Sequence, residues 1–201
     1  MLGEQFQHDG IASQLQTNEI IRGLKDATAG KTLTPEQRNA TLQFLRSGRA
    51  ALDAHNRTVA GEFLARNAHE PGVITLPSGL QYRVLNAGEA GAKRPSANDQ
   101  VTVRYRAALA DGTEFDRSDT HDRPATFVVK TVLKGWQEAL LAMPEGAKWQ
   151  LFVPPDLGYG ANPPPQVPPG SLLIYELELL RIGSVAPAPA AARGPPPTPS
   201  Q

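Results

Sequence analysis

The chain has 201 residues, of which 40% are hydrophobic and 20% are charged, and its 20 Lys and Arg residues balance its 20 Asp and Glu residues. This composition is typical of a globular protein, and no stretch reaches the roughly 18 consecutive apolar residues that a membrane span requires. The charge balance gives no support to a polybasic surface for nucleic acid. Cysteine is absent, so disulfides, Cys-ligated zinc and thiol catalysis are excluded.

The length predicts two compact units, or one unit with a long extension. Residues 1–10 contain neither the basic start nor the apolar core of a signal peptide. We therefore expect a cytoplasmic protein, or a mature form from which a signal has been removed.

Residues 1–72 are predicted to be helical, in two parts. Apolar residues recur at roughly helical spacing between Ile11 and Leu24, and the region around Gly30 interrupts the pattern. The segment is expected to form a separate helical domain and stalk.

The second helix has a clear start. Thr34 can cap it, Pro35 suits the first helical position, and Gln37 completes a capping box. No further proline occurs until Pro71, so the helix would extend over some 35 residues and about 50 Å at 1.5 Å per residue. That length exceeds what a small core can cover, which favours a stalk or a helix with a partner.

An interrupted heptad repeat follows this helix, with polar residues at some of its positions. Its members are Leu42, Leu45, Arg49, Leu52, Asn56, Val59 and Phe63. Two interpretations are open: the repeat packs on a helical partner, or the helix lies on the neighbouring domain of its own chain. The length and the repeat favour the helical partner.

After Pro71 the pattern changes to alternation, which is typical of half-buried strands. The clearest case runs from Val101 to Leu109, and Asp111-Gly112 follows it as a hairpin turn. The other predicted strands are 81–85, 126–129, 148–153 and 172–181, with one short apolar helix over 135–142. One helix among antiparallel strands predicts an α+β domain over 73–183, in which the helix packs on one face of the sheet.

Residues 184–201 contain six prolines and little apolar bulk. Such a segment cannot offset the entropy of ordering, so a disordered tail is predicted, and a spacer is favoured over a proline-rich ligand for a partner.

Familiar catalytic groupings do not form. The four histidines (His8, His55, His69 and His121) share no metal-ligand spacing. Gly158 and Gly160 resemble part of a glycine-rich nucleotide-binding loop, but such a loop leads into a helix. The proline-rich run that follows them cannot form one. The acidic cluster Asp116, Asp119 and Asp122 lacks the spacing of a calcium loop, so a solvated turn is favoured.

Aromatic residues stand out in the second domain instead. They fall within or beside the predicted strands and the short helix, where half or more would ordinarily be plain core. The set comprises Tyr105, Phe115, Phe127, Trp136, Tyr159 and Tyr175.

The surrounding strings are more specific. In order and spacing, SGLQYRVL, VTVRYRAAL, DGTEFD, RPATFVV, VLKGWQEALLAMPEGAKWQLFVPPDLGYG and VPPGSLLIYELELL resemble an FKBP-type peptidyl-prolyl cis-trans isomerase domain, from about Val73 to Ile182. The preceding string NRTVAGEFLARNAHEPGV resembles the end of the amino-terminal dimerisation part of the Mip and FkpA branch of that family.

The resemblance implies a proline pocket. Its catalytic residues would be Tyr105, Phe115, Asp116, Trp136 and Tyr159, and its substrate-binding residues would be Phe127, Val132, Leu133, Val167 and Tyr175. Trp136 would form the floor, while the backbone N–H of Leu133 and the hydroxyl of Tyr159 would bond substrate carbonyls. Val167 and the proline-rich loop before it would form a flap.

The implied function is isomerisation of X–Pro bonds in folding proteins, without metal or cofactor. The alternative is a chaperone or binding module of the same fold with little isomerase (rotamase) activity. The resemblance also implies a homodimer through the N-terminal helices that clamps unfolded chains, proline-containing peptides and macrolide inhibitors as ligands, and a location in the bacterial periplasm or at the outer surface. Ala125 and residues 119–123 depart from the family pattern, which bears on macrolide affinity and sequence preference.

Overall fold

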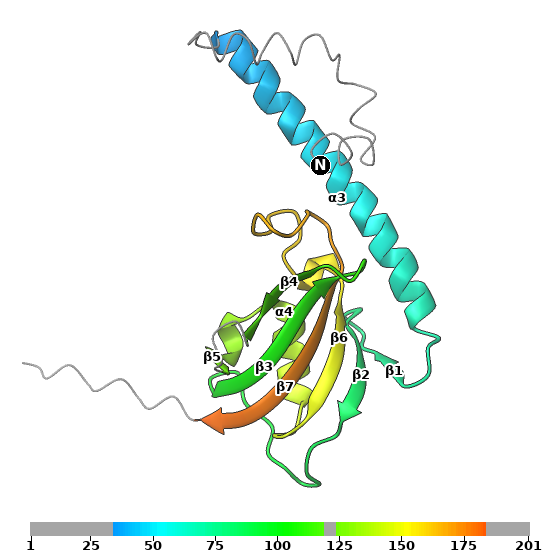
Figure 1. Cartoon of the computed structure of the whole chain (residues 1–201), viewed down its shortest axis with the longest axis vertical. Coiled ribbons are helices and arrows are strands. Elements are labelled where there is room, and N and C mark those ends of the chain that lie inside the picture. The colour runs from blue at the N-terminus through cyan, green and yellow to red at the C-terminus, as the bar shows by residue number, and fades with distance from the viewer. Residues whose placement is uncertain (1–33, 119–123, 184–201) are drawn as a thin grey trace, which may run out of the picture.

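The computed structural model describes residues 34–118 and 124–183 (Figure 1). The expectations for residues 11–24, for 119–123 and for the C-terminal tail lie outside the described residues, as does the capping side chain of Gln37.

A single long helix, α3 (Pro35–Asn67), leads into the second domain. Its predicted start is confirmed: the helix begins at Pro35, and the carbonyl of Thr34 accepts the N–H of Arg38 at 2.9 Å. It ends at Asn67, whose Nδ2 donates to Oε1 of Gln81 at 2.8 Å. This buried side-chain bond fixes the end of the helix to the first long strand of the domain.

The second domain is built on one antiparallel sheet in the order β1-β2-β6-β7-β3-β4, with β5 also paired to β3. The strands are β1 (Val73–Thr75), β2 (Gln81–Asn86), β3 (Gln100–Leu109), β4 (Glu114–Arg117), β5 (Ala125–Val128), β6 (Lys148–Val153) and β7 (Leu173–Gly183). The predicted α+β class and the five predicted strands are confirmed within two residues at each end. The short strands β1 and β4 were not predicted.

Strand β3 lies at the centre of the site-bearing half of the sheet. Val101, Val103 and Ala107 are buried, whereas Arg104 and Arg106 are exposed, as the alternation predicts. On one side β3 pairs with β7, and on the other its first part pairs with β5 and its last part with β4. The predicted hairpin turn is present, with Gly112 at φ +88°.

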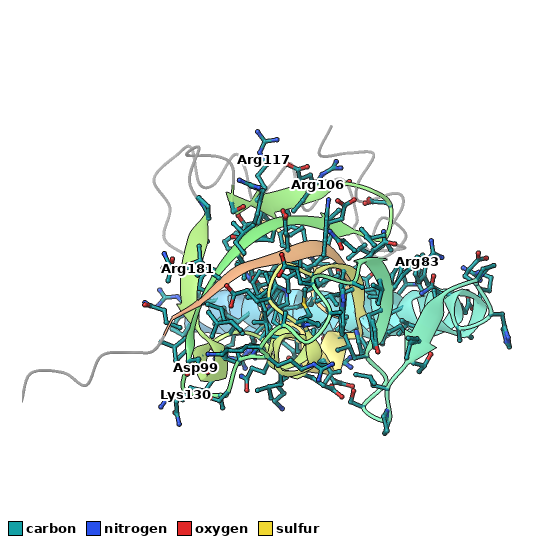
Figure 2. The ribbon with its side chains drawn as sticks, turned by 90° about the horizontal axis from the view of Figure 1, so that it is seen from below. Arg83, Asp99, Arg106, Arg117, Lys130 and Arg181 are labelled. Atoms are coloured by element: carbon teal, nitrogen blue, oxygen red, sulfur yellow. The ribbon has the colours of Figure 1, made fainter. Side chains whose placement is uncertain are left out.

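Helix α4 (Lys134–Ala142) packs in the hollow of the sheet, which arches over it in Figure 2. Its buried residues are Gly135, Trp136, Ala139 and Leu140. Gly135 permits the close approach, because a Cβ there would lie 2.7 Å from Cγ1 of Val153. Charged side chains such as Arg106 and Arg117 point away from this core (Figure 2).

The two halves of α3 have different surroundings. The first half projects beyond the domain (Figure 1), and Leu45 is 60% exposed. In the second half Ala60 is buried, and the ring of Phe63 lies 5.9 Å from that of Phe152. The expectation that a helical partner covers the whole heptad repeat is therefore wrong for its Phe63 end, because the chain's own sheet covers it there.

Within the described residues, the structure contains no helix with the length and apolar character needed to span a membrane.

Candidate active site

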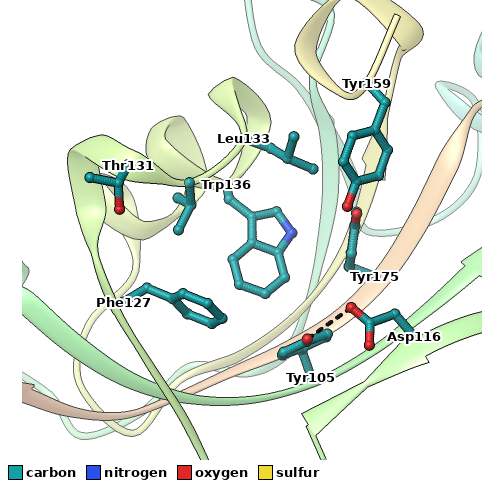
Figure 3. Close-up of a pocket in the computed structure, with 9 residues that line it drawn as sticks. Tyr105, Asp116, Phe127, Thr131, Leu133, Trp136, Tyr159 and Tyr175 are labelled. Carbon is teal, nitrogen blue, oxygen red and sulfur yellow. Dashed lines mark hydrogen bonds between the residues drawn. The ribbon is translucent and has the colours of Figure 1, made fainter. Parts of the chain in front are cut away.

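A cavity of about 270 Å³ opens at the N-terminal end of α4 (Figure 3). Strands β3, β4, β5 and β7, helix α4, and the loops before α4 and after β6 all contribute to it. Its lining residues are Tyr105, Asp116, Phe127, Thr131, Val132, Leu133, Trp136, Tyr159 and Tyr175.

Trp136 forms the base of the cavity. It lies in the first turn of α4 and is only 5% exposed. Three rings meet the indole nearly edge to face, with centroid distances of 5.0 Å for Tyr105, 6.0 Å for Phe127 and 5.2 Å for Tyr175. This is a favoured geometry for aromatic pairs, so the indole is held in one orientation by rings from three different strands.

The polar edge of the cavity is formed by Tyr105 on β3 and Asp116 on β4. The hydroxyl of Tyr105 donates to Oδ2 of Asp116 at 2.9 Å (Figure 3). Burial, and secondly this hydrogen bond, raise the pKa of Tyr105 far above its usual value. The phenol therefore keeps its proton, and the carboxylate is held at the rim.

Tyr159 and Tyr175 bring their hydroxyls together on the same side of the cavity as Asp116 (Figure 3). Burial raises the pKa of both residues. The interaction between the two hydroxyls also contributes to the pKa of each residue, after burial. Both residues line the cavity, so a phenol hydroxyl is present at this part of its wall.

The backbone before α4 is also fixed. The side chain of Gln137 donates to the carbonyl of Val132 at 2.8 Å, and its N–H donates to the carbonyl of Leu133 at 2.9 Å. Because the first N–H groups at a helix start lack intrahelical acceptors, the N–H of Leu133 can bond a carbonyl of a bound chain. Neither Gln137 nor the lining residue Thr131 was predicted, since neither carries an aromatic or charged signal.

Two predicted site residues do not line the cavity. Phe115 is half-buried against the core, with its ring 6.2 Å from that of Tyr175 and nearly perpendicular to it. The β3–β4 register shifts beside it, which leaves Phe115 as the extra residue of a bulge and turns it toward the core. Val167 is buried in the core, and its N–H bonds the carbonyl of Pro164.

No group of three or more His, Asp or Glu side chains in the described part of the chain is arranged to hold a metal ion. The cavity itself presents aromatic faces, one carboxylate and phenol hydroxyls, beside the backbone N–H of Leu133.

The fold and this cavity define a class of protein, and comparison with known proteins agrees. The chain belongs to the FKBP-type peptidyl-prolyl cis-trans isomerase family: the family profile matches residues 91–180, and the profile of the domain amino terminal to it matches residues 1–84. The predicted resemblance is confirmed.

Several relatives match over most of their length. The chain is 37% identical to the outer membrane protein MIP of Legionella longbeachae, over 92% of this chain and 82% of that protein. It is 38% identical to the FKBP-type 22 kDa peptidyl-prolyl cis-trans isomerase of Escherichia coli, over 90% of each. The crystal structure of FkpA from Escherichia coli matches with a TM-score of 0.68 and 33% identity, over 91% of this chain and 92% of that one.

Proposed function

We propose that this isomerase-family chain accelerates cis-trans rotation of X–Pro bonds in the cavity above Trp136. The observation that carries the proposal is the cage of Tyr105, Phe127 and Tyr175 around a fixed, buried indole. Such a cage offers a proline ring an apolar base with polar groups only at the rim.

The physical reason lies in the amide itself. Rotation about the X–Pro bond breaks resonance and meets a barrier of roughly 18 to 20 kcal/mol. The planar amide is more dipolar than the twisted one, so transfer from water into an apolar cavity costs the planar state more. The barrier falls only because the cavity destabilises the planar amide more than the twisted amide.

The polar groups would hold the chain on both sides of the rotating bond. The O–H of Tyr159 and the N–H of Leu133 would bond flanking carbonyls, and the Asp116 carboxylate would bind the polar edge of the peptide. With the flanking groups fixed, rotation is confined to one side of the bond.

The test is a short peptide with a single X–Pro bond, with an apolar residue before the proline. The full chain should accelerate isomerisation, and a chelator should leave the rate unchanged. The alternative is a chaperone or binding module with little isomerase activity. A folded sample whose rate equals the uncatalysed rate would favour that alternative.

We further propose a homodimer formed through the N-terminal helices, whose two arms clamp unfolded proteins. Exposed apolar side chains on the projecting half of α3 support it, among them Leu42, Phe44 and Leu45. In this proposal residues 1–72 dimerise, residues 73–183 isomerise, and residues 184–201 form a tail. When one pocket of the dimer holds a client, the linked second pocket is present at a raised effective concentration for that same client.

Macrolides that fill the aromatic cage would act as inhibitors. A periplasmic or outer-surface location is supported by the name of the Legionella longbeachae relative, an outer membrane protein.

A further inference from the structure

Tyr159 lies in the proline-rich loop between β6 and β7, close to the second half of α3. The loop is closed beside this residue, because the N–H of Gly160 bonds the carbonyl of Pro155 and the N–H of Gly170 bonds the carbonyl of Gly160, both at 3.0 Å. Gly160 and Gly170 therefore form the neck of the loop. Figure 1 shows the loop at the end of the sheet that faces α3.

Three side chains of α3 bond to this loop on both sides of Tyr159. The bonds join Nη1 of Arg57 to Oδ1 of Asp156 at 2.7 Å, Nη2 of Arg49 to the carbonyl of Ala161 at 3.0 Å, and Nδ2 of Asn56 to the carbonyl of Pro169 at 2.8 Å. Asn56 and Arg57 follow Arg49 by seven and eight positions, about two helical turns, which places all three donors on the same side of the helix.

The neck also touches the helix backbone directly. Gly170 has φ +72°, and a Cβ at this position would lie 3.0 Å from Cα of Asp53 and closer still to its carbonyl oxygen. Asp53 also orients Arg57, because its Oδ2 accepts from Nε of that arginine at 2.8 Å. The guanidinium is thus held between Asp53 on the helix and Asp156 on the loop.

We infer that α3 is part of the machinery of the isomerase pocket: Asn56 and Arg57 are positioning residues that hold the Tyr159 loop. The inference rests on the proposed function of that pocket. Asp156 is 80% exposed, so its ion pair contributes little alone. The bonds act together because they join one rigid helix face to segments within about ten residues of Tyr159, on either side of the neck.

This arrangement joins the two parts of the protein. A helix that carries the proposed dimer contacts in its first half holds a pocket loop with its second half. The orientation of the arm and the position of the Tyr159 hydroxyl are therefore linked through Asn56 and Arg57.

The test uses the full chain with Asn56→Ala and Arg57→Ala combined. We expect kcat/KM for the short peptide to fall about fivefold, with the loss mainly in kcat, because the Tyr159 hydroxyl is less well placed. Arg46→Ala, an exposed arginine three turns earlier on α3, is the matched control and should change nothing. Arg57→Lys, which keeps the charge, should recover part of the loss.

A double-mutant cycle separates positioning from general damage. In a Tyr159→Phe background the hydroxyl is already absent, so the Asn56→Ala, Arg57→Ala pair should cost less than twofold. Equal losses in both backgrounds, or no loss in either, would overturn the inference. If the double variant does not fold, the single Arg57→Gln variant is used in the same cycle.

Hydrogen exchange gives a readout that does not depend on catalysis. The amides of Gly160 and Gly170 close the neck, so they should exchange at least about tenfold faster in the double variant, while Val103 at the centre of the sheet is unchanged. If the wild-type chain proves inactive, the proposed function fails, and this exchange measurement alone decides whether α3 holds the loop. Unchanged amide exchange at both Gly160 and Gly170 would reject the inference that α3 holds the loop.

Discussion

Tyr105 and Asp116 face each other from neighbouring strands, with the phenol hydroxyl 2.9 Å from Oδ2 of the carboxylate. The bond orients the carboxylate toward the cavity and consumes the only proton of the phenol. Asp116 therefore acts as an acceptor at the rim, in a fixed position.

Replacing Asp116 tests this role. Asp116→Ala should lower kcat/KM for an X–Pro peptide about tenfold, which corresponds to about 1.4 kcal/mol of transition-state stabilisation. The thermal midpoint should change little, because the side chain is exposed at the rim. If Asp116→Ala unfolds the domain while the folded remainder keeps full activity, its assigned role is wrong.

Phe115 and Tyr159 should behave differently from each other. Tyr159→Phe keeps the ring and removes only the hydroxyl, so it should reduce the rate by less than tenfold and cost no more stability than one hydrogen bond, about 1 kcal/mol. Phe115→Ala removes a ring that packs against Tyr175 and the core, so it should reduce both rate and thermal stability. Peptide kinetics and thermal melts on both variants separate the two effects.

Replacing Gly170 should destabilise the protein more than replacing Gly91. Both have positive φ, at +72° and +78°, but a Cβ at Gly170 meets the backbone of Asp53, whereas Gly91 has nothing within 4 Å. Gly91→Ala should cost about 1 kcal/mol in the free energy of unfolding, from the strain of a Cβ at positive φ alone. Gly170→Ala should cost more and lower activity; equal urea midpoints for the two variants would contradict the close contact.

High pH should destabilise the fold through Tyr175. Burial raises the folded-state pKa of this phenol far above 10.0, its value in an unfolded chain. Its contribution to stability is therefore complete below about pH 10 and decreases as the pH rises further, since the unfolded chain releases the proton first. The slope is at most about 1.4 kcal/mol per pH unit. Urea unfolding between pH 9 and 11 should show a shallower decrease for Tyr175→Phe than for the wild type.

Charges on the projecting half of α3 should break the proposed dimer. Leu42→Glu with Leu45→Glu should sediment as a monomer at micromolar concentration, because two carboxylates cannot be buried in an apolar interface. Leu85→Glu, at a comparably exposed leucine on β2, is the control and should leave the dimer intact. Activity on short peptides should stay within twofold, while proline-limited refolding of a client protein should slow. A wild-type chain that is already monomeric, with full refolding activity, would reject the clamp.

Local sequence was sufficient for most of the architecture. The alternation from Val101 to Leu109 predicts β3, because neighbouring side chains of a strand lie on opposite faces. The start of α3 could be read from Thr34 and Pro35, because capping and a preset φ act within one turn. Family resemblance then placed Tyr105, Asp116, Trp136 and Tyr159 on one pocket, and all four line the cavity.

Only the tertiary structure decided how these elements meet. A bulge in the β3–β4 pairing turns Phe115 toward the core, and Val167 is buried beside a turn that its N–H closes on Pro164. Neither arrangement has a local signal in the sequence. The surroundings of α3 were also decided by the tertiary structure, although its heptad repeat favoured a helical partner. Its second half instead docks on the loop of Tyr159, because Gly170 lacks the Cβ that would keep that loop away from the helix backbone. Contacts between segments about 100 residues apart depend on shape and approach distance, which a local pattern of apolar and polar residues does not encode.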